Sequence, residues 1–242
     1  MEFRVNPGKN VEIKVGDRTF LRHSIKTHFV SEGEDYIEVV KKYVSPIYQE
    51  GDIISISEKI IAMCQNRVLC TKDIRLGFWA KLLSKFVNVT PAGEAVGNPY
   101  KMQIAIKLAG LPRILFAAFC AAIGKLFGKR GIFYKIAGNG ISGIDGFCRD
   151  AFDYYLDKGI LNPDNPDGVC NEIKDKLGVD CMIVDANDLG VDILGKSSSI
   201  KYSVEELAGM IKDNPAGQAN QQTPITLIRE KIGEAEAAAA RE

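Results

Sequence analysis

The chain has 242 residues, enough for one large domain or two small ones and for a sizeable core. Its 31 basic and 31 acidic residues give a formal net charge of zero, which does not favour nucleic-acid binding, because nucleic-acid-binding domains usually carry a basic excess. With 46% hydrophobic and 26% charged residues, the composition is that of an ordinary soluble globular protein.

The six cysteines are scattered, and no Cys-x-x-Cys pair suggests a zinc or redox site. They are therefore expected to be small buried apolar residues in a reducing compartment. The start of the chain is polar and lacks the apolar run of a signal peptide. The predicted location is cytoplasmic.

The apolar run at 114–123 has to be compared with a membrane span. A spanning helix needs about 20 apolar residues, so this run is too short, and no membrane partner is expected. Its alanine-rich composition instead predicts a tightly packed, buried element of the core.

The first third of the chain predicts a β-hairpin followed by short strands and helices. Residues 11–15 alternate apolar and charged side chains, Gly16-Asp17 forms a turn, and residues 19–21 resume the strand. Apolar residues at helical spacing predict a helix at 35–44. The other elements expected here are strands at 25–30 and 53–57 and the start of a helix at 58–65.

In the middle of the chain, residues 132–137 predict a strand that enters a glycine-rich turn. The turn carries Gly138, Gly140, Gly143 and Gly146, which are expected to supply positive φ angles.

The last third contains the clearest helix signals. Asn165 is a good N-cap, Pro166 suits the first helical position, and Gly178 ends the helix. Residues 179–184 predict a buried strand that ends in an acidic run. The remaining elements expected are a helix at 203–212 opened by a capping box, a strand at 225–229 and an Ala/Glu-rich tail at 231–242.

Two glycine patterns resemble nucleotide-binding loops. Residues 190–197 match G-x-x-x-x-G-K-[ST], and residues 138–143 match G-x-G-x-x-G. Both patterns need a helix directly after the glycines, but three serines end the first and Asp145-Gly146 interrupts the second. We therefore expect neither loop, and a dinucleotide-dependent oxidoreductase is kept only as an alternative function.

A series of short runs extends along most of the chain. In order they are GDIISISEKII at 51–61, QNR at 65–67, an Ala/Gly-rich run at 137–145, LNPDNPD at 161–167, IVD at 183–185, GQ at 217–218 and TPITLIR at 223–229. Together they resemble the coenzyme F420-0:gamma-glutamyl ligase family. The resemblance implies one domain at 1–230 followed by the tail at 231–242, with a mixed α/β fold, largely antiparallel sheets and flanking helices.

The resemblance also implies a chemistry. Members of this family use GTP and a divalent metal ion, Mg²⁺ or Mn²⁺. A substrate carboxylate attacks the terminal phosphate to give an acyl phosphate, and the amine of glutamate then displaces phosphate to form an amide. The implied partners are a small-molecule carboxylate, glutamate and a second copy of the chain in a homodimer.

The same resemblance implies the site residues. Asp145 and Asp185 are the expected catalytic and metal-binding carboxylates, with Asp188 as a further metal ligand. Hard divalent cations prefer carboxylate oxygens, and a rigid sheet would hold Asp145 and Asp185 at the ends of apolar runs, converging on one cation. Lys59 is the expected catalytic contact to phosphate. The nucleotide-binding residues implied are Ser57, Glu58, Lys59, Asn139 and Gln218.

The chain departs from the family pattern beside both aspartates. The run GFC at 146–148 replaces Gln-Ser-Asn, and residues 185–190 lack the hydroxyl and the arginine of Asp-[Ser/Thr]-x-Gly-Arg. A non-catalytic nucleotide- or metal-binding protein is therefore a second alternative. His23 and His28 are the only histidines and are expected to be structural or rim residues, so a Ser-His-Asp hydrolase is not supported.

Overall fold

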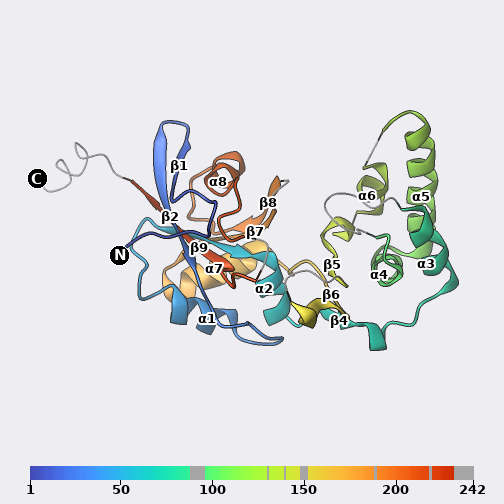
Figure 1. The fold of residues 1–242 in the computed structure, drawn as a ribbon, viewed down its shortest axis with the longest axis horizontal. Helices are drawn as coiled ribbons and strands as arrows, with labels where there is room; N and C mark the ends of the chain where they lie inside the picture. The colour runs from blue at the N-terminus through green and yellow to red at the C-terminus, as the bar shows by residue number, and fades with distance from the viewer. Residues whose placement is uncertain are drawn as a thin grey trace, which may run out of the picture. The chain divides into compact units, whose positions relative to one another are not determined.

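The computed structural model describes residues 1–87, 96–129, 131–138, 140–147, 152–187, 190–217 and 220–231. The chain forms two compact units (Figure 1). Met1–Asn66 and the chain from Pro163 onward form the first unit, and Arg67–Asn162 form the second, which is thus inserted in the sequence of the first. The predicted domain at 1–230 stays a prediction, and the tail from residue 232 lies outside the described residues.

A six-stranded sheet forms the centre of the first unit. Its strands are Glu12–Val15 (β1), Arg18–Ile25 (β2), Ile53–Ser57 (β3), Asp180–Asn187 (β7), Gly190–Lys196 (β8) and Ile225–Glu230 (β9). Their order is β1-β2-β9-β3-β7-β8, with β3 and β7 parallel and the other neighbouring pairs antiparallel. This confirms the predicted mixed α/β fold with largely antiparallel strands.

Each face of this sheet carries its own hydrophobic core. The helices of the unit are Tyr36–Tyr43 (α1), Glu58–Cys64 (α2), Pro166–Leu177 (α7) and Val204–Met210 (α8). Ile54 and Ile56 of β3 pack with residues of α1, α2 and α7. Ile53, one residue before Ile54 and so on the opposite face, packs instead with Leu207 and Met210 of α8. Because successive side chains of a strand point to opposite faces, β3 contributes to both cores and is buried in the centre of the unit.

Side-chain caps fix where the helices of the first unit begin. Asp35 caps α1 and Asn165 caps α7. Ser203 and Glu206 form a reciprocal capping box at α8, as predicted. Gly178, in the left-handed conformation, ends α7.

The predicted separate strand at 25–30 is wrong. Strand β2 continues through Ile25, which pairs with Ile225, and the chain then leaves the sheet. Pro224 precedes Ile225, and a proline has no N–H to extend a strand ladder. The pairing of β2 therefore ends where its partner β9 begins.

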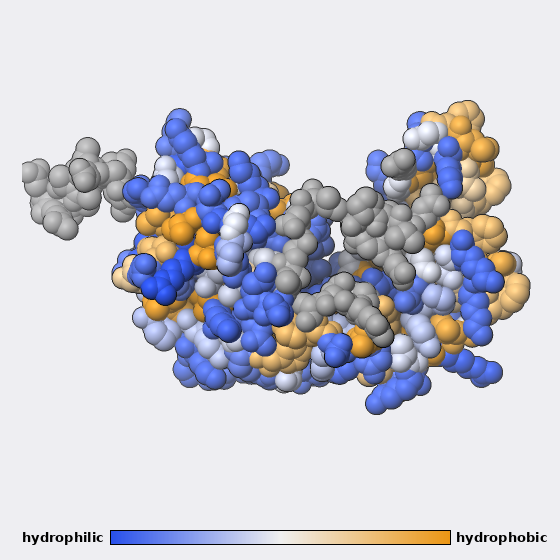
Figure 2. Space-filling view, viewed as in Figure 1, coloured by the Kyte–Doolittle hydropathy of each residue, from blue (hydrophilic) through white to orange (hydrophobic). Residues whose placement is uncertain are grey.

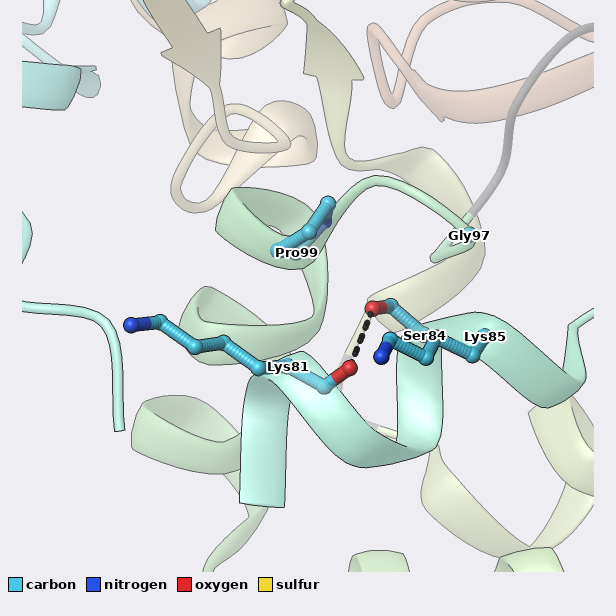
Figure 3. A pocket seen from close by; sticks show the side chains of 5 residues that line it. All are labelled: Lys81, Ser84, Lys85, Gly97 and Pro99. Atoms are coloured by element: carbon cyan, nitrogen blue, oxygen red, sulfur yellow. Dashed lines mark hydrogen bonds between the residues drawn. The ribbon is translucent and has the colours of Figure 1, made fainter. Parts of the chain in front are cut away.

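The second unit combines a small antiparallel sheet with four α-helices among its described residues. The sheet has the order β4-β6-β5, formed by Val68–Cys70 (β4), Asp145–Gly146 (β5) and Lys158–Ile160 (β6). The helices are Phe78–Leu83 (α3), Pro99–Ala109 (α4), Leu111–Leu126 (α5) and Ile132–Ala137 (α6). Met102 and Ile104 of α4, with Ile114 of α5, are central to its separate core. An open hollow of about 370 Å³ is lined by Lys81, Ser84, Lys85, Gly97 and Pro99 (Figure 3).

The strand predicted at 132–137 is wrong, because these residues form α6. Gly131 takes the left-handed conformation that starts the helix. Ile132 then packs on Gly124 of α5 so closely that a Cβ at Gly124 would lie 2.1 Å from the Ile132 Cδ1 atom. Packing on α5 therefore overrides the strand preference of a run rich in isoleucine and aromatic residues.

The apolar run at 114–123 lies within α5, but only one side of the helix is buried. Ile114 and Ala117 are fully buried, whereas Phe116 and Phe119 are 59% and 61% exposed. The prediction of a tightly packed core element is therefore wrong for half of the helix, and Figure 2 shows hydrophobic side chains gathered over α5. Within the described residues, no single helix has the length and apolar character of a membrane span, although α4 and α5, bent by 117° at their junction, meet that criterion as a pair.

Candidate functional site

One edge of the central sheet of the first unit gathers several of the predicted site residues. Strands β2, β3 and β7 run in the same direction, so their carboxyl ends meet at this edge. Ser57 ends β3 and is paired with Val184 of β7, so that Glu58 and Lys59 continue from one strand while Asp185 continues from its neighbour. Ligands of open α/β sheets bind outside the carboxyl ends of parallel strands. We call Ser57, Glu58, Lys59 and Asp185 the β3–β7 edge.

The backbone around this edge is held by the segment before β9. The Ser57 N–H donates to the Pro224 carbonyl at 2.9 Å, which continues the β3–β9 pairing past the end of the ladder. Thr27 N donates to the Gln222 carbonyl at 2.9 Å on the far side of β9. The TPITLIR run therefore fixes the ends of β2 and β3 together.

Two carboxylates face each other across β7 and β8. Asp185 is half-buried and is the register partner of Asp192, which is exposed. Like charges directly opposite on neighbouring strands are destabilising, and a bound cation would offset that repulsion. Both groups supply the hard oxygen donors that Mg²⁺ and Mn²⁺ prefer, so the donor atoms of the pair are of the type that binds a divalent cation.

The second predicted carboxylate belongs to the second unit. Asp145 is half-buried in β5, where its Oδ1 atom accepts a hydrogen bond from the N–H of Gly146 at 2.6 Å, and its register partner is Ile160. Asp185 is in the first unit, so the convergence of Asp145 and Asp185 on one cation stays a prediction.

Asn162 is a site candidate that the sequence analysis missed. It lies two residues beyond Ile160, and its Oδ1 atom is buried without a hydrogen-bond partner among the described residues. A Cβ at Gly143 would lie 2.1 Å from that Oδ1 atom, so the glycine turn leaves room for the amide. A buried acceptor with no donor is costly, and amide oxygens ligate hard cations. Asn162 belongs to the LNPDNPD run, for which the resemblance implied no site residue.

Gly146 holds the backbone beside Asp145 in a form that only glycine adopts readily. Its φ is +87°, and an added Cβ would lie 2.0 Å from the Lys158 backbone oxygen. We expect Gly146→Ala to lower the free energy of unfolding by about 1–3 kcal/mol, measured by urea denaturation. Gly128→Ala is the matched control, because Gly128 has φ +70° but no atom within 4 Å of the added Cβ. Equal losses for the two variants would show that the contact with Lys158 has no cost.

Three other predicted site residues, Asn139, Asp188 and Gln218, lie outside the described residues, and their roles stay predictions. Across the described part of the chain, no three His, Cys, Asp or Glu side chains are grouped as a metal centre. The described residues therefore offer pairs of oxygen donors, not a complete acidic cluster.

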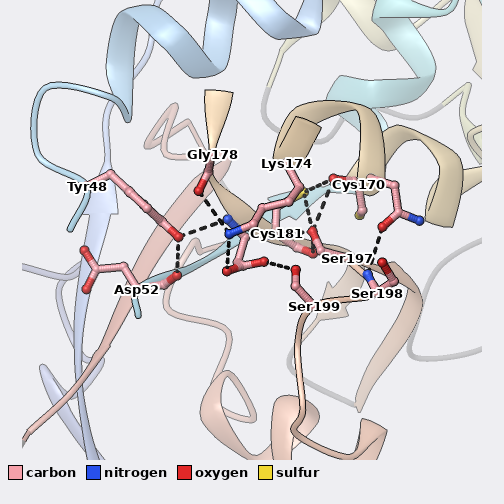
Figure 4. Close-up of polar contacts among 11 residues, drawn as sticks. Tyr48, Asp52, Cys170, Lys174, Gly178, Cys181, Ser197, Ser198 and Ser199 are labelled. Atoms are coloured by element: carbon pink, nitrogen blue, oxygen red, sulfur yellow. Dashed lines mark hydrogen bonds and ion pairs between the residues drawn. The ribbon is translucent and has the colours of Figure 1, made fainter. Parts of the chain in front are cut away.

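The phosphate-loop pattern at 190–197 is not a loop. Residues 190–196 form β8, and Lys196 Nζ donates to the Ile200 and Tyr202 carbonyls at 2.8 and 3.0 Å. Figure 4 shows Ser197 in contact with Cys170 and Cys181; its buried hydroxyl lies 3.0 Å from the Cys181 N–H, whose hydrogen bond it accepts. The lysine and the serine of this pattern are therefore used in structural contacts, as the missing helix had indicated.

The second glycine pattern, at 138–143, is followed by β5 rather than by a helix. Gly138, Gly140 and Gly146 have the positive φ angles expected of a turn, whereas the prediction of a positive φ at Gly143 is wrong. A dinucleotide needs the N-terminus of a helix for its pyrophosphate, so this turn gives the oxidoreductase alternative no structural support.

Two residues of the family-like runs at 51–61 and 223–229, Asp52 and Arg229, form a structural ion pair and do not belong to the candidate site. Asp52, in the run at 51–61, is 1% exposed and receives hydrogen bonds from Arg229 Nε and Nη2, both at 2.6 Å. The bidentate pair with Asp52 raises the pKa of Arg229. It ties the start of β3 to β9 at the end of the sheet opposite the β3–β7 edge.

The histidines and three of the cysteines have structural environments: Cys64, Cys170 and Cys181 are buried as predicted, whereas Cys70 and Cys120 are only half-buried. His28 stacks on Tyr43 and lies 2.7 Å from Glu34, while burial lowers the pKa of His23, whose Nδ1 accepts from Arg4 N. Burial raises the pKa of Cys64 to about 12, so its thiolate is not populated at neutral pH. No disulfide joins the described cysteines.

Comparison with known proteins agrees with the family resemblance of the runs up to residue 185, whereas the runs at 217–218 and 223–229 lie outside the matched span. No curated protein matches the chain. The family model for F420-0:gamma-glutamyl ligase matches residues 24–193, a span that includes β3, α2, the whole second unit, β7 and the Asp185–Asp192 pair. Membership in this family supports a ligase role in coenzyme F420 biosynthesis. On this match the chain belongs to the F420-0:gamma-glutamyl ligase family.

Proposed function

We propose that the protein uses GTP and a divalent cation to join a small-molecule carboxylate to the amino group of glutamate. The proposal is supported most by one observation: the family match covers the β3–β7 edge, where Lys59 follows β3 and Asp185 lies in β7, one residue past Val184, the register partner of Ser57. A lysine beside a carboxylate pair suits phosphoryl transfer, which needs positioning and charge neutralisation more than covalent catalysis.

The reaction has two steps. An oxygen of the substrate carboxylate attacks the γ-phosphorus of GTP, the bond to the β-phosphate oxygen breaks, and acyl phosphate and GDP form. The glutamate nitrogen then attacks the acyl carbon and loses a proton, and inorganic phosphate leaves. Lys59 neutralises phosphate charge in the first step, and Ser57 and Glu58 orient the nucleotide. Asp185, with Asp192, holds the cation, which supplies further charge neutralisation; Asp145 and Asn162 are the corresponding donors of the second unit.

The test measures phosphate release from GTP with Mg²⁺ or Mn²⁺, glutamate and F420-0. We expect release to require all four components and to stop when EDTA removes the metal. Asp185→Asn and Lys59→Gln should each lower the rate on the order of 100-fold, because each removes a charge that stabilises the transferred phosphoryl group.

Two exposed residues of the first unit supply matched controls. Asp175→Asn and Lys212→Gln make the same chemical changes away from the β3–β7 edge and should leave the rate unchanged. Metal-dependent GTP binding without phosphate release would indicate the non-catalytic alternative. Full activity in Asp185→Asn would remove the β3–β7 edge from the proposal.

A further inference from the structure

The outward side of α5 is an apolar surface of the second unit. Its members are Phe116, Phe119, Ile123, Leu126 and the following residue Phe127, which are 59%, 61%, 41%, 84% and 75% exposed; we call them the α5 stripe. At 3.6 residues per turn they fall within an arc of about 100°. Ile114, Ala117 and Gly124 occupy the buried side of the same helix. The helix is therefore apolar on two sides, although the core of the unit covers only one.

The charge of this part of the chain is strongly one-sided. Between residues 74 and 144 the sequence has ten Lys and Arg residues and a single acid, Glu94, although the whole chain is neutral. Lys125 in the last turn of α5 and Lys129 just after it are both exposed near the C-terminal end of the α5 stripe. Lys81 in α3 and Lys85 just after it are likewise exposed, and both line the hollow in Figure 3.

A second open hollow borders the α5 stripe. It has a volume of about 360 Å³ and is lined by Cys120, Ile123, Gly124, Phe127, Lys129 and Ile132. Its walls are mostly apolar, and Lys129 supplies a cation. This combination suits a hydrocarbon segment joined to an anionic group.

We propose that the α5 stripe docks the protein on the surface of an anionic lipid bilayer. Apolar side chains on one helix face enter the boundary between headgroups and acyl chains, while nearby lysines are attracted to anionic headgroups. A second copy fits this surface less well, because its own second unit, with a single acid between residues 74 and 144, offers Lys125 and Lys129 no anionic partner. A nucleic acid would satisfy the lysines but leave the apolar arc in water. The proposal goes beyond the ligase function and differs from the expectation of no membrane partner, which considered only a spanning helix.

The test is co-sedimentation of the full chain with vesicles. We expect binding to vesicles of equal parts phosphatidylglycerol and phosphatidylcholine, weaker binding to pure phosphatidylcholine, and loss of that difference in high salt. Phe119→Ser with Leu126→Ser should weaken binding on the order of 100-fold, since each side chain leaves an apolar environment. Lys125→Glu should weaken binding at least about fivefold, and only to the anionic vesicles.

The controls are changes on the first unit. Val204→Ser removes a 49% exposed aliphatic side chain, and Lys212→Glu reverses an exposed charge; both should leave vesicle binding unchanged. Circular dichroism should show that all variants are folded, because the changed side chains are exposed. Failure of the wild-type chain to bind anionic vesicles would overturn the proposal. So would a fall in oligomeric state, without any change in vesicle binding, in the Phe119→Ser, Leu126→Ser variant.

Discussion

Replacing Asp52 with alanine is expected to lower the free energy of unfolding by about 3–5 kcal/mol, because it leaves the charge of Arg229 in a mostly buried position without its partner. The carboxylate of Asp52 is almost fully buried and also accepts from the N–H of Gln49 at 2.8 Å. The variant therefore loses three hydrogen bonds at the start of β3. Chemical denaturation followed by circular dichroism measures the loss.

A double variant separates the ion pair from general damage. Asp52→Ala combined with Arg229→Met should be less destabilised than Asp52→Ala alone, since no charge is then left unpaired. Glu38→Ala, which breaks the exposed pair with Lys41, should change stability by no more than about 0.5 kcal/mol. If the single and double variants were equally destabilised, the uncompensated charge could not be the cause.

Arg22→Ala is expected to lower the free energy of unfolding by about 3–5 kcal/mol, because the guanidinium of Arg22 is fully buried in the first unit. Its Nη2 atom donates to Asp213 at 2.9 Å and also contacts the Asn10 carbonyl, and its Nη1 atom donates to the Met210 carbonyl at 3.2 Å. The substitution leaves these acceptors unsatisfied and opens a cavity between β2 and the segment after α8. Thermal and chemical unfolding would both report the loss.

The same pair predicts how stability depends on pH. Partial burial acts to raise the pKa of Asp213, but the hydrogen bonds and charge of Arg22 outweigh it and hold that pKa below its usual value of 3.8. The pair therefore contributes full stability above about pH 3.8, and the contribution is lost as the pH falls through the lower folded pKa. Arg22→Ala should remove this acid-dependent part, whereas Arg18→Ala, in the same strand but with an exposed partner, should retain it. A wild-type and an Arg22→Ala curve that run parallel below pH 3.8 would contradict this assignment.

The parts of the fold that the sequence predicts well are those with local chemical signals. Caps, turns or apolar runs of adjacent residues predict several elements correctly. These are the hairpin of β1 and β2, the strand β3 and the helices capped by Asn165 and Ser203. Residues 132–137 have the composition of a strand, and their helix depends on contact with Gly124, which no local pattern contains. For the same reason composition did not distinguish the buried from the exposed side of α5.

In the candidate site, too, the residues with local sequence signals were predicted, and those that depend on tertiary contacts were not. The order of motifs led to the family and to Lys59 and Asp185, because strand ends and their following residues are visible in sequence. Asp192 is not among the residues that the resemblance implies, and its position opposite Asp185 follows from the β7–β8 register. Asn162 was missed because its significance is the missing hydrogen bond of a buried oxygen, which depends on the turn at Gly143.

The position of β9 in the central sheet has a consequence for how the chain is made. Strand β9 is the last described strand, yet it lies between β2 and β3, and β3 is separated from its parallel partner β7 by the whole second unit. During synthesis from the ribosome, all of Arg67–Asn162 emerges before β7 and β9, and the contacts within this unit form without them. β2 and β3, by contrast, must wait with open edges until Ile225–Glu230 has been translated. Late closure of the sheet leaves these strand edges unpaired during synthesis, a condition that favours aggregation of nascent chains.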